Sequence, residues 1–185
     1  MVQESRQINA LQVKPMFDGR LRRKKRIAIV HIHRRFTMKI RYAHTNIVAH
    51  DWRRLSSFYI NVFNCKEKPP IRNLSGYWLD ALTGIPNARI HGIHLLIPGF
   101  GIDGPTLEIF QYNDDIKDNK SINKEGFGHI AFSVEDVEEC LERVIKNGGS
   151  TVGETIKTEI QGVGKIHVVY AKDPENNVIE IQKWE

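Results

Sequence analysis

Hydrophobic and polar positions follow the same order of patterns twice along the chain. A segment rich in β-branched and aromatic residues, 40–48, predicts a strand. Apolar residues at helical spacing come next and predict an amphipathic helix of about three turns, which Asp51 caps. The helix ends at Asn64, and Pro69-Pro70 then indicates a connecting loop. The apolar residues of this helix are Trp52, Leu55, Phe58, Tyr59 and Val62.

The rest of the first half is typical of strands with loops between them. Residues 93–97 form the clearest strand pattern and stop at Pro98-Gly99, and Thr106–Tyr112 predicts another strand. The Asn-, Asp- and Lys-rich segment 113–124 carries almost no core-forming residues. We therefore interpret it as a linker between two halves.

The same order of elements returns after the linker. Residues 127–134 predict a strand, and Asp136 caps a helix that ends at the Asn-Gly-Gly sequence 147–149. Two further strands are predicted at 166–171 and 178–182. The second half therefore repeats the elements of the first.

Matching letters support a duplication of one βαβββ module, with copies at about 39–112 and 126–185. The sequence AHTNIVAHD at 43–51 aligns with GHIAFSVED at 128–136, and in each a histidine precedes the helix-capping aspartate by seven residues. The first strand of each module therefore offers one histidine at the same relative position.

The paired histidines are His44 and His129, and the last strand of each module adds a glutamate at matching positions, Glu108 and Glu180. Alternate residues of a strand face opposite sides, so the apolar neighbours of each glutamate are expected toward a helix-covered core. Each glutamate then faces the concave side of its sheet. An isolated carboxylate is costly there unless it is paired or coordinated.

Two imidazoles and two carboxylates at duplicated positions predict a site for one divalent cation. A lone strand His or Glu is usually a surface residue or a satisfied core group, but four at matching positions favour a shared site. Such donors suit zinc, nickel, cobalt or manganese and leave positions for water or substrate. We interpret the other six histidines as structural or solvent-exposed: His31, His33, His50, His91, His94 and His167.

Composition agrees with an ordinary globular domain, because 41% of residues are hydrophobic and 26% are charged. The net charge of +5 comes from one end of the chain: residues 1–37 hold ten Lys/Arg and two Asp/Glu, a net of +8, which leaves −3 for residues 38–185. We therefore expect no nucleic-acid partner. The basic run 20–26 also suits a phosphate polymer or a membrane surface, but we interpret 1–37 as a disordered extension or an upstream-start artefact.

Cysteine usage and hydropathy favour a cytoplasmic protein. Cys65 and Cys140 are too few for a disulfide framework and lack the spacing of a zinc site. The apolar run 27–32 is short and is followed at once by basic residues, so it predicts neither a membrane span nor a secretory signal. We expect no membrane partner.

The four candidate ligands and the motifs around them resemble the vicinal-oxygen-chelate superfamily, which includes glyoxalase I (lactoylglutathione lyase), methylmalonyl-CoA epimerase, extradiol dioxygenases and fosfomycin-resistance transferases. The resemblance covers about 39–185, and 126–134 and 173–181 are similar to second-half motifs of glyoxalase I. It implies an α+β fold whose two modules form a curved mixed sheet with a metal site in the concave face.

The resemblance also narrows the ligand set. The set His44, Glu108, His129 and Glu180 is typical of glyoxalase I. Dioxygenases and fosfomycin-resistance enzymes of the superfamily use two histidines and one carboxylate, and the epimerase usually has glutamine where Glu108 stands. A glyoxalase I-like enzyme with one divalent ion per site is therefore implied, with nickel or zinc favoured over cobalt or manganese.

The implied reaction is that of a lyase or isomerase that moves a proton next to a carbonyl through a metal-bound enediolate, with Glu180 as the first candidate base and Glu108 as its counterpart. Segment 75–92 does not resemble the usual glutathione-binding surround, which leaves three alternatives. These are an epimerase-like isomerase, an extradiol dioxygenase, and a metal-free protein that binds a small molecule such as an antibiotic. We expect a small-molecule substrate and a homodimer, with the site either within one chain or shared between two.

Overall fold

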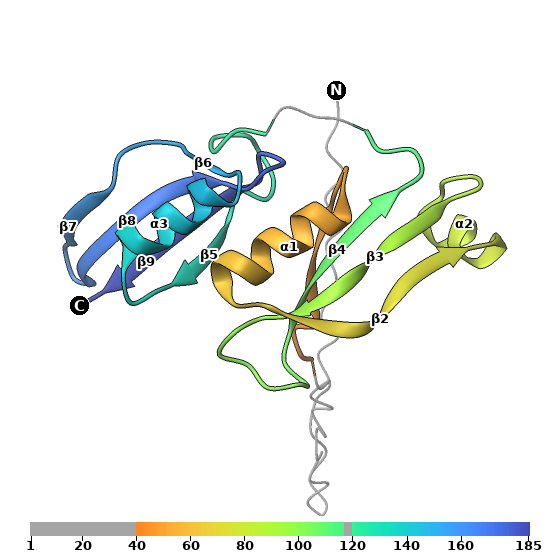
Figure 1. The fold of residues 1–185 in the computed structure, drawn as a ribbon, viewed down its shortest axis with the longest axis horizontal. Helices are drawn as coiled ribbons and strands as arrows, with labels where there is room; N and C mark the ends of the chain where they lie inside the picture. The colour runs from red at the N-terminus through yellow and green to blue at the C-terminus, as the bar shows by residue number, and fades with distance from the viewer. Residues whose placement is uncertain (1–39, 117–119) are drawn as a thin grey trace, which may run out of the picture. The chain divides into compact units, whose positions relative to one another are not determined.

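The computed structural model describes residues 40–116 and 120–185 (Figure 1). The basic extension expected at 1–37 lies outside the described residues, as do His31 and His33. Among the described residues, no helix combines the length and the hydropathy needed to cross a membrane.

The first module has its helix where the apolar spacing predicts it. Asp51 caps α1 because its carboxylate accepts hydrogen bonds from the backbone N–H groups of Arg53 and Arg54, each at 3.1 Å. Asn64 ends the helix in the left-handed conformation. The elements of the module are β1 (His44–Val48), α1 (Trp52–Phe63), β2 (Lys66–Ser75), α2 (Tyr77–Thr83), β3 (Arg89–Leu96) and β4 (Thr106–Tyr112).

Two elements of this module differ from the sequence prediction. The Pro69-Pro70 segment was expected to be a loop, but it lies within β2, where the pairing with β3 is irregular between Lys68 and Arg72. β2 is the edge strand of its sheet, so a proline that lacks an N–H group costs little there. The short helix α2 was also not predicted. It ends at Gly84, which has a φ of 71°.

The second module repeats this order with two variations, the first of which is that no counterpart of α2 lies between Ile130 and Trp184. Asp136 caps α3 by accepting a hydrogen bond from the backbone N–H of Glu139 at 2.9 Å. Two short strands, β6 and β7, take the place of a single second strand, and both pair with β8. The elements are β5 (Ile130–Ser133), α3 (Val137–Lys146), β6 (Ser150–Thr151), β7 (Ile156–Ile160), β8 (Gly164–Lys172) and β9 (Val178–Trp184).

Each module forms its own mixed sheet, with strand orders β1-β4-β3-β2 and β5-β9-β8-β6. The first and last strands of each module pair in parallel, with Asn46 opposite Glu108 and Ala131 opposite Glu180. In both modules the paired histidine stands two residues before the residue opposite the glutamate. The α+β fold of two βαβββ modules is therefore confirmed, although its strands form two sheets and not one.

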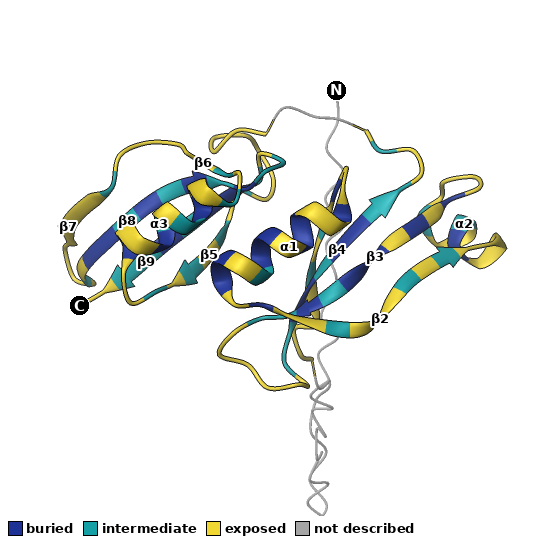
Figure 2. Cartoon of the chain, in the orientation of Figure 1, coloured by how far each residue is buried: buried dark blue, intermediate teal, exposed yellow. Residues whose placement is uncertain are grey.

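The core joins the helix-covered sides of both sheets. α1 and α3 contact each other, and the buried residues follow the sides of α1 and α3 that face the strands (Figure 2). The ring of Phe63 at the end of α1 stacks on Phe132 of β5 with centroids 3.9 Å apart. The face of each sheet opposite α1 or α3 is here called its open face. On the open face of the first sheet, Leu79 of α2 packs with Ile90 and Phe110.

The turn between β8 and β9 ties the second module to α1. The Tyr59 hydroxyl donates a hydrogen bond to the Asp173 carboxylate at 2.9 Å. Glu175 accepts hydrogen bonds from the backbone N–H groups of His50 and Asp51, each at 2.8 Å. Burial raises the pKa of Asp173, which is only 2% exposed, and hydrogen bonds to its carboxylate partly offset this effect.

Replacing Tyr59 by Phe should lower the free energy of unfolding by roughly 1–3 kcal/mol at neutral pH, because Asp173 loses a buried donor. Because the pKa of Asp173 is raised, this carboxyl binds a proton more readily in the folded state than in the unfolded state. Its contribution to the free energy of unfolding is therefore present at low pH and is lost as pH rises. Because the Tyr59 hydrogen bond favours the charged carboxylate, the cost of the substitution should shrink as pH falls.

Urea unfolding of the Y59F variant at several pH values would measure this effect. Tyr77→Phe is the matched control, since that side chain is exposed. A Y59F variant as stable as the parent at neutral pH would contradict a role for this contact in joining the modules.

The two thiols should be unreactive in the folded protein. Burial raises the pKa of Cys65 to about 12 and that of Cys140 to about 11, so little thiolate forms at mild pH. A thiol reagent at pH 8 should therefore label neither cysteine quickly, and both should react at once in denaturant. Rapid labelling of the native protein would contradict the burial of these side chains.

Candidate metal centre

His44 and Glu108 meet on the open face of the first sheet. Nε2 of His44 lies 3.4 Å from Oε2 of Glu108, whose side chain is 13% exposed. Asn46 donates a hydrogen bond to the same oxygen at 3.4 Å. Leu107 and Ile109 are buried on the other face, as strand alternation predicts. This pair and its surroundings are called the first half-site.

His129 and Glu180 form the second half-site in the same way. Nε2 of His129 lies 3.0 Å from Oε2 of Glu180, whose side chain is 14% exposed. Tyr170 of β8 stands directly opposite Glu180, and its ring makes an edge contact with His129 at a centroid distance of 5.2 Å. Burial and the nearby Glu180 carboxylate raise the pKa of Tyr170, so the phenol keeps its proton.

Sequence reasoning missed His94, which we had interpreted as structural or solvent-exposed. It lies directly opposite Glu108 in the antiparallel pairing of β3 with β4, and its Nε2 is 3.1 Å from Oε1 of that carboxylate. His91 is exposed and faces the other side, as expected for residues three apart in a strand. Only the register between strands shows which residue meets Glu108, and no letter pattern marks it.

His50 and His167 agree with the interpretation that they are solvent-exposed or structural. His50 is largely exposed, and its Nδ1 lies 3.2 Å from Oδ2 of Asp115. His167 is buried, with Nε2 3.0 Å from Oε1 of Glu138 on α3. Neither lies at a position that the duplication repeats.

The four predicted ligands meet as two pairs and not as one cluster. Within 40–116 and 120–185, no three His, Cys, Asp or Glu side chains are grouped with the spacing of metal ligands. The shared core lies on the helix side of both sheets, whereas each half-site lies on the open face of its own sheet. One chain therefore presents two separate halves of the expected donor set.

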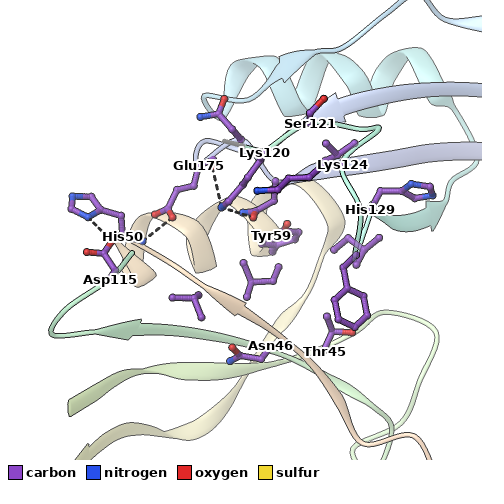
Figure 3. A pocket seen from close by; sticks show the side chains of 18 of the residues that line it. Thr45, Asn46, His50, Tyr59, Asp115, Lys120, Ser121, Lys124, His129 and Glu175 are labelled. Carbon is purple, nitrogen blue, oxygen red and sulfur yellow. Dashed lines mark hydrogen bonds and ion pairs between the residues drawn. The ribbon is translucent and has the colours of Figure 1, made fainter. Parts of the chain in front are cut away.

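A pocket of about 1500 Å³ runs beside β1 and the segment that leads into β5 (Figure 3). Both His44 and His129 line it, together with the apolar side chains of Ile47 and Ile130. Neither glutamate of the half-sites is among its lining residues. The pocket therefore follows the edges of the two histidine-bearing strands and does not enclose the four donors.

The fold and the duplicated half-sites define a protein of the vicinal-oxygen-chelate class. Residues 41–181 match the sequence profile of the Glyoxalase/Bleomycin resistance protein/Dioxygenase superfamily, and the chain belongs to this superfamily. A search of curated proteins gives no match.

Solved structures of this class share the fold. A glyoxalase family protein from Bacillus cereus is 20% identical, with 81% of this chain and 97% of that chain covered and a TM-score of 0.70. The fosfomycin resistance protein FosX from Listeria monocytogenes is 21% identical, with 80% and 96% covered and a TM-score of 0.53. A glyoxylase/bleomycin resistance protein/dioxygenase domain from Frankia sp. EAN1pec is 17% identical, with 80% and 98% covered and a TM-score of 0.51.

Proposed function

We propose that this protein is a metal-dependent lyase or isomerase that moves a proton next to a carbonyl group, with chemistry like that of glyoxalase I. The observation that carries the proposal is the repeated His–Glu pair. In each module a mostly buried carboxylate lies within 3.4 Å of an imidazole nitrogen, at the same position of the strand pairing. Membership of the superfamily supports this reading of the pairs.

The donors of the two half-sites fit a borderline divalent ion. Two imidazole nitrogens and two carboxylate oxygens suit nickel or zinc, and also cobalt or manganese. The residues that would hold the ion are His44, Glu108, His129 and Glu180. A cation would also offset the cost of two carboxylates that are only 13% and 14% exposed. When bound, such an ion stabilises negative charge that develops on neighbouring substrate oxygens.

A second copy of the chain completes each site in this proposal. The first half-site of one copy would meet the second half-site of the other, because within one chain the two do not form a cluster of described residues. The open face of the second sheet also exposes three apolar side chains, Ile156, Ile160 and Trp184, which a partner would cover. A homodimer of twofold symmetry would contain two equivalent sites.

Residues of the chain supply the proton transfer. Glu180 is the first candidate for the base that removes the proton next to the carbonyl, and Glu108 is its counterpart in the other half-site. The apolar cluster of Leu79, Ile90 and Phe110 lies on the same open face as Glu108 and would keep water from one side of a small substrate.

Metal binding should depend on all four donors and on pairing between chains. His44→Ala and His129→Ala should each abolish tight binding of nickel or zinc. Metal analysis after desalting would measure this loss. Mixing the two variants under exchange conditions should restore about a quarter of the sites, because half of the dimers become mixed and each then holds one intact donor set. His91→Ala is the control, since that side chain lies on the other face.

No recovery in the mixture, despite exchange of chains, would show that each site lies within one chain. A folded parent protein that retains no metal would contradict the metal-dependent function and favour a metal-free binding protein of the same fold.

Replacing Glu180 by Gln should lower turnover by about 100-fold or more while leaving the fold intact, because the variant loses its base. Metal-loaded protein would be assayed with methylglyoxal and a thiol for thioester formation, with methylmalonyl-CoA in deuterated water for isotope uptake, and with a catechol and oxygen for ring cleavage. Glu159→Gln on the exposed strand β7 is the matched control. Full turnover by the E180Q variant would remove Glu180 as the base, and ring cleavage would favour the dioxygenase alternative.

A further inference from the structure

We propose that His94 is a positioning residue of the first half-site, whose imidazole holds one oxygen of Glu108 so that the other oxygen faces His44. This inference rests on the proposed function, because the oxygen left facing His44 is the one that would bind the metal. Duplication of the module does not predict it, because the matching position of the second module is a tyrosine, Tyr170.

The two oxygens of Glu108 have separate partners. Oε1 lies 3.1 Å from Nε2 of His94, whereas Oε2 lies 3.4 Å from Nε2 of His44 and accepts the hydrogen bond from Asn46. A carboxylate held through one oxygen offers mainly the other to a cation. His94 would therefore leave Oε2 of Glu108, on the side of His44, to a bound cation.

The contacts of His94 favour one tautomer. Nε2 lies 3.1 Å from Oε1 of Glu108, and an ionised carboxylate only accepts hydrogen bonds, so the proton of the neutral ring is expected on Nε2. Nδ1 is then an acceptor, and it lies 3.2 Å from Oγ1 of Thr106. The Thr106 hydroxyl is part of a buried residue, so this bond satisfies a group that would otherwise be costly.

The surroundings of His94 hold the ring in place. The ring of Phe110 makes an edge contact with the imidazole at a centroid distance of 5.5 Å. The side chain is only 19% exposed, so it has little room to turn away from Glu108.

The second half-site places a different side chain opposite its glutamate. Tyr170 stands opposite Glu180 as His94 stands opposite Glu108, and the ring of Tyr170 contacts His129. The two duplicated glutamates therefore have the same backbone position but unequal partners. This inequality distinguishes two carboxylates that the sequence repeat makes equivalent.

Cobalt binding to His94 variants tests the role of this residue toward the metal. His94→Phe keeps the ring volume but removes the donor, so cobalt affinity should fall by roughly 10- to 100-fold and the ligand-field absorption of the bound ion should change. His94→Gln can still donate an N–H and should restore most of both. The control His91→Phe, on the same strand, should behave as the parent. Parent-like affinity and spectrum in the H94F variant would overturn the proposal.

Nuclear magnetic resonance of the metal-free protein tests the contact without the metal. His94 should have its proton on Nε2 at neutral pH, and Glu108→Leu should shift its ring nitrogen resonances. A proton on Nδ1, or averaging between the two nitrogens, would refute the geometry whatever the metal result. A parent protein that binds no cobalt would instead refute the metal-dependent function, and the tautomer would then decide the His94–Glu108 contact by itself.

Discussion

The hydrogen bond from the Tyr59 hydroxyl to the Asp173 carboxylate joins the two modules at a fully buried point. The other donors to this carboxylate, Glu175 and Asn177, belong to the same turn, so the Tyr59 hydroxyl is the donor that holds the turn against α1. Glu175 adds a second link by accepting N–H groups at the start of α1, where the helix dipole favours negative charge. Because this turn leads into β9, the strand that carries Glu180 is tied to the helix of the other module.

This arrangement decides what each sheet presents to its surroundings. With α1 and α3 sharing one core, the helix sides of both sheets are used for folding, and the open faces carry the His–Glu pairs. Folding of one chain therefore builds the two halves of the proposed donor set without joining them. A dimeric site follows from this geometry in the proposed function, since a second copy offers the complementary half with the same backbone positions.

Equal backbone positions do not make the two half-sites chemically equal. Glu108 lies 3.1 Å from the imidazole of His94, whereas Glu180 stands opposite Tyr170. A duplicated fold supplies two similar frames, and single substitutions on β3 and β8 then differentiate the carboxylates. In the proposed function, such a difference would let one glutamate serve mainly as a ligand while the other takes part in proton transfer.

The sequence by itself determined the helices α1 and α3, their aspartate caps and the repeated positions of His44, Glu108, His129 and Glu180, because spacing and capping act over a few neighbouring residues. The sequence did not reveal that His94 contacts Glu108. His94 is 14 residues from Glu108, whereas the corresponding Tyr170 is 10 residues from Glu180. Because the two hairpins differ in length, the sequence repeat does not align these two positions. Only the tertiary structure decided that β2 continues through Pro69 and Pro70, and where the two half-sites lie. An edge strand tolerates a residue without an N–H group, which explains the prolines of β2. The apolar stripe of a helix shows which side of the helix is covered, but it does not show which module covers it.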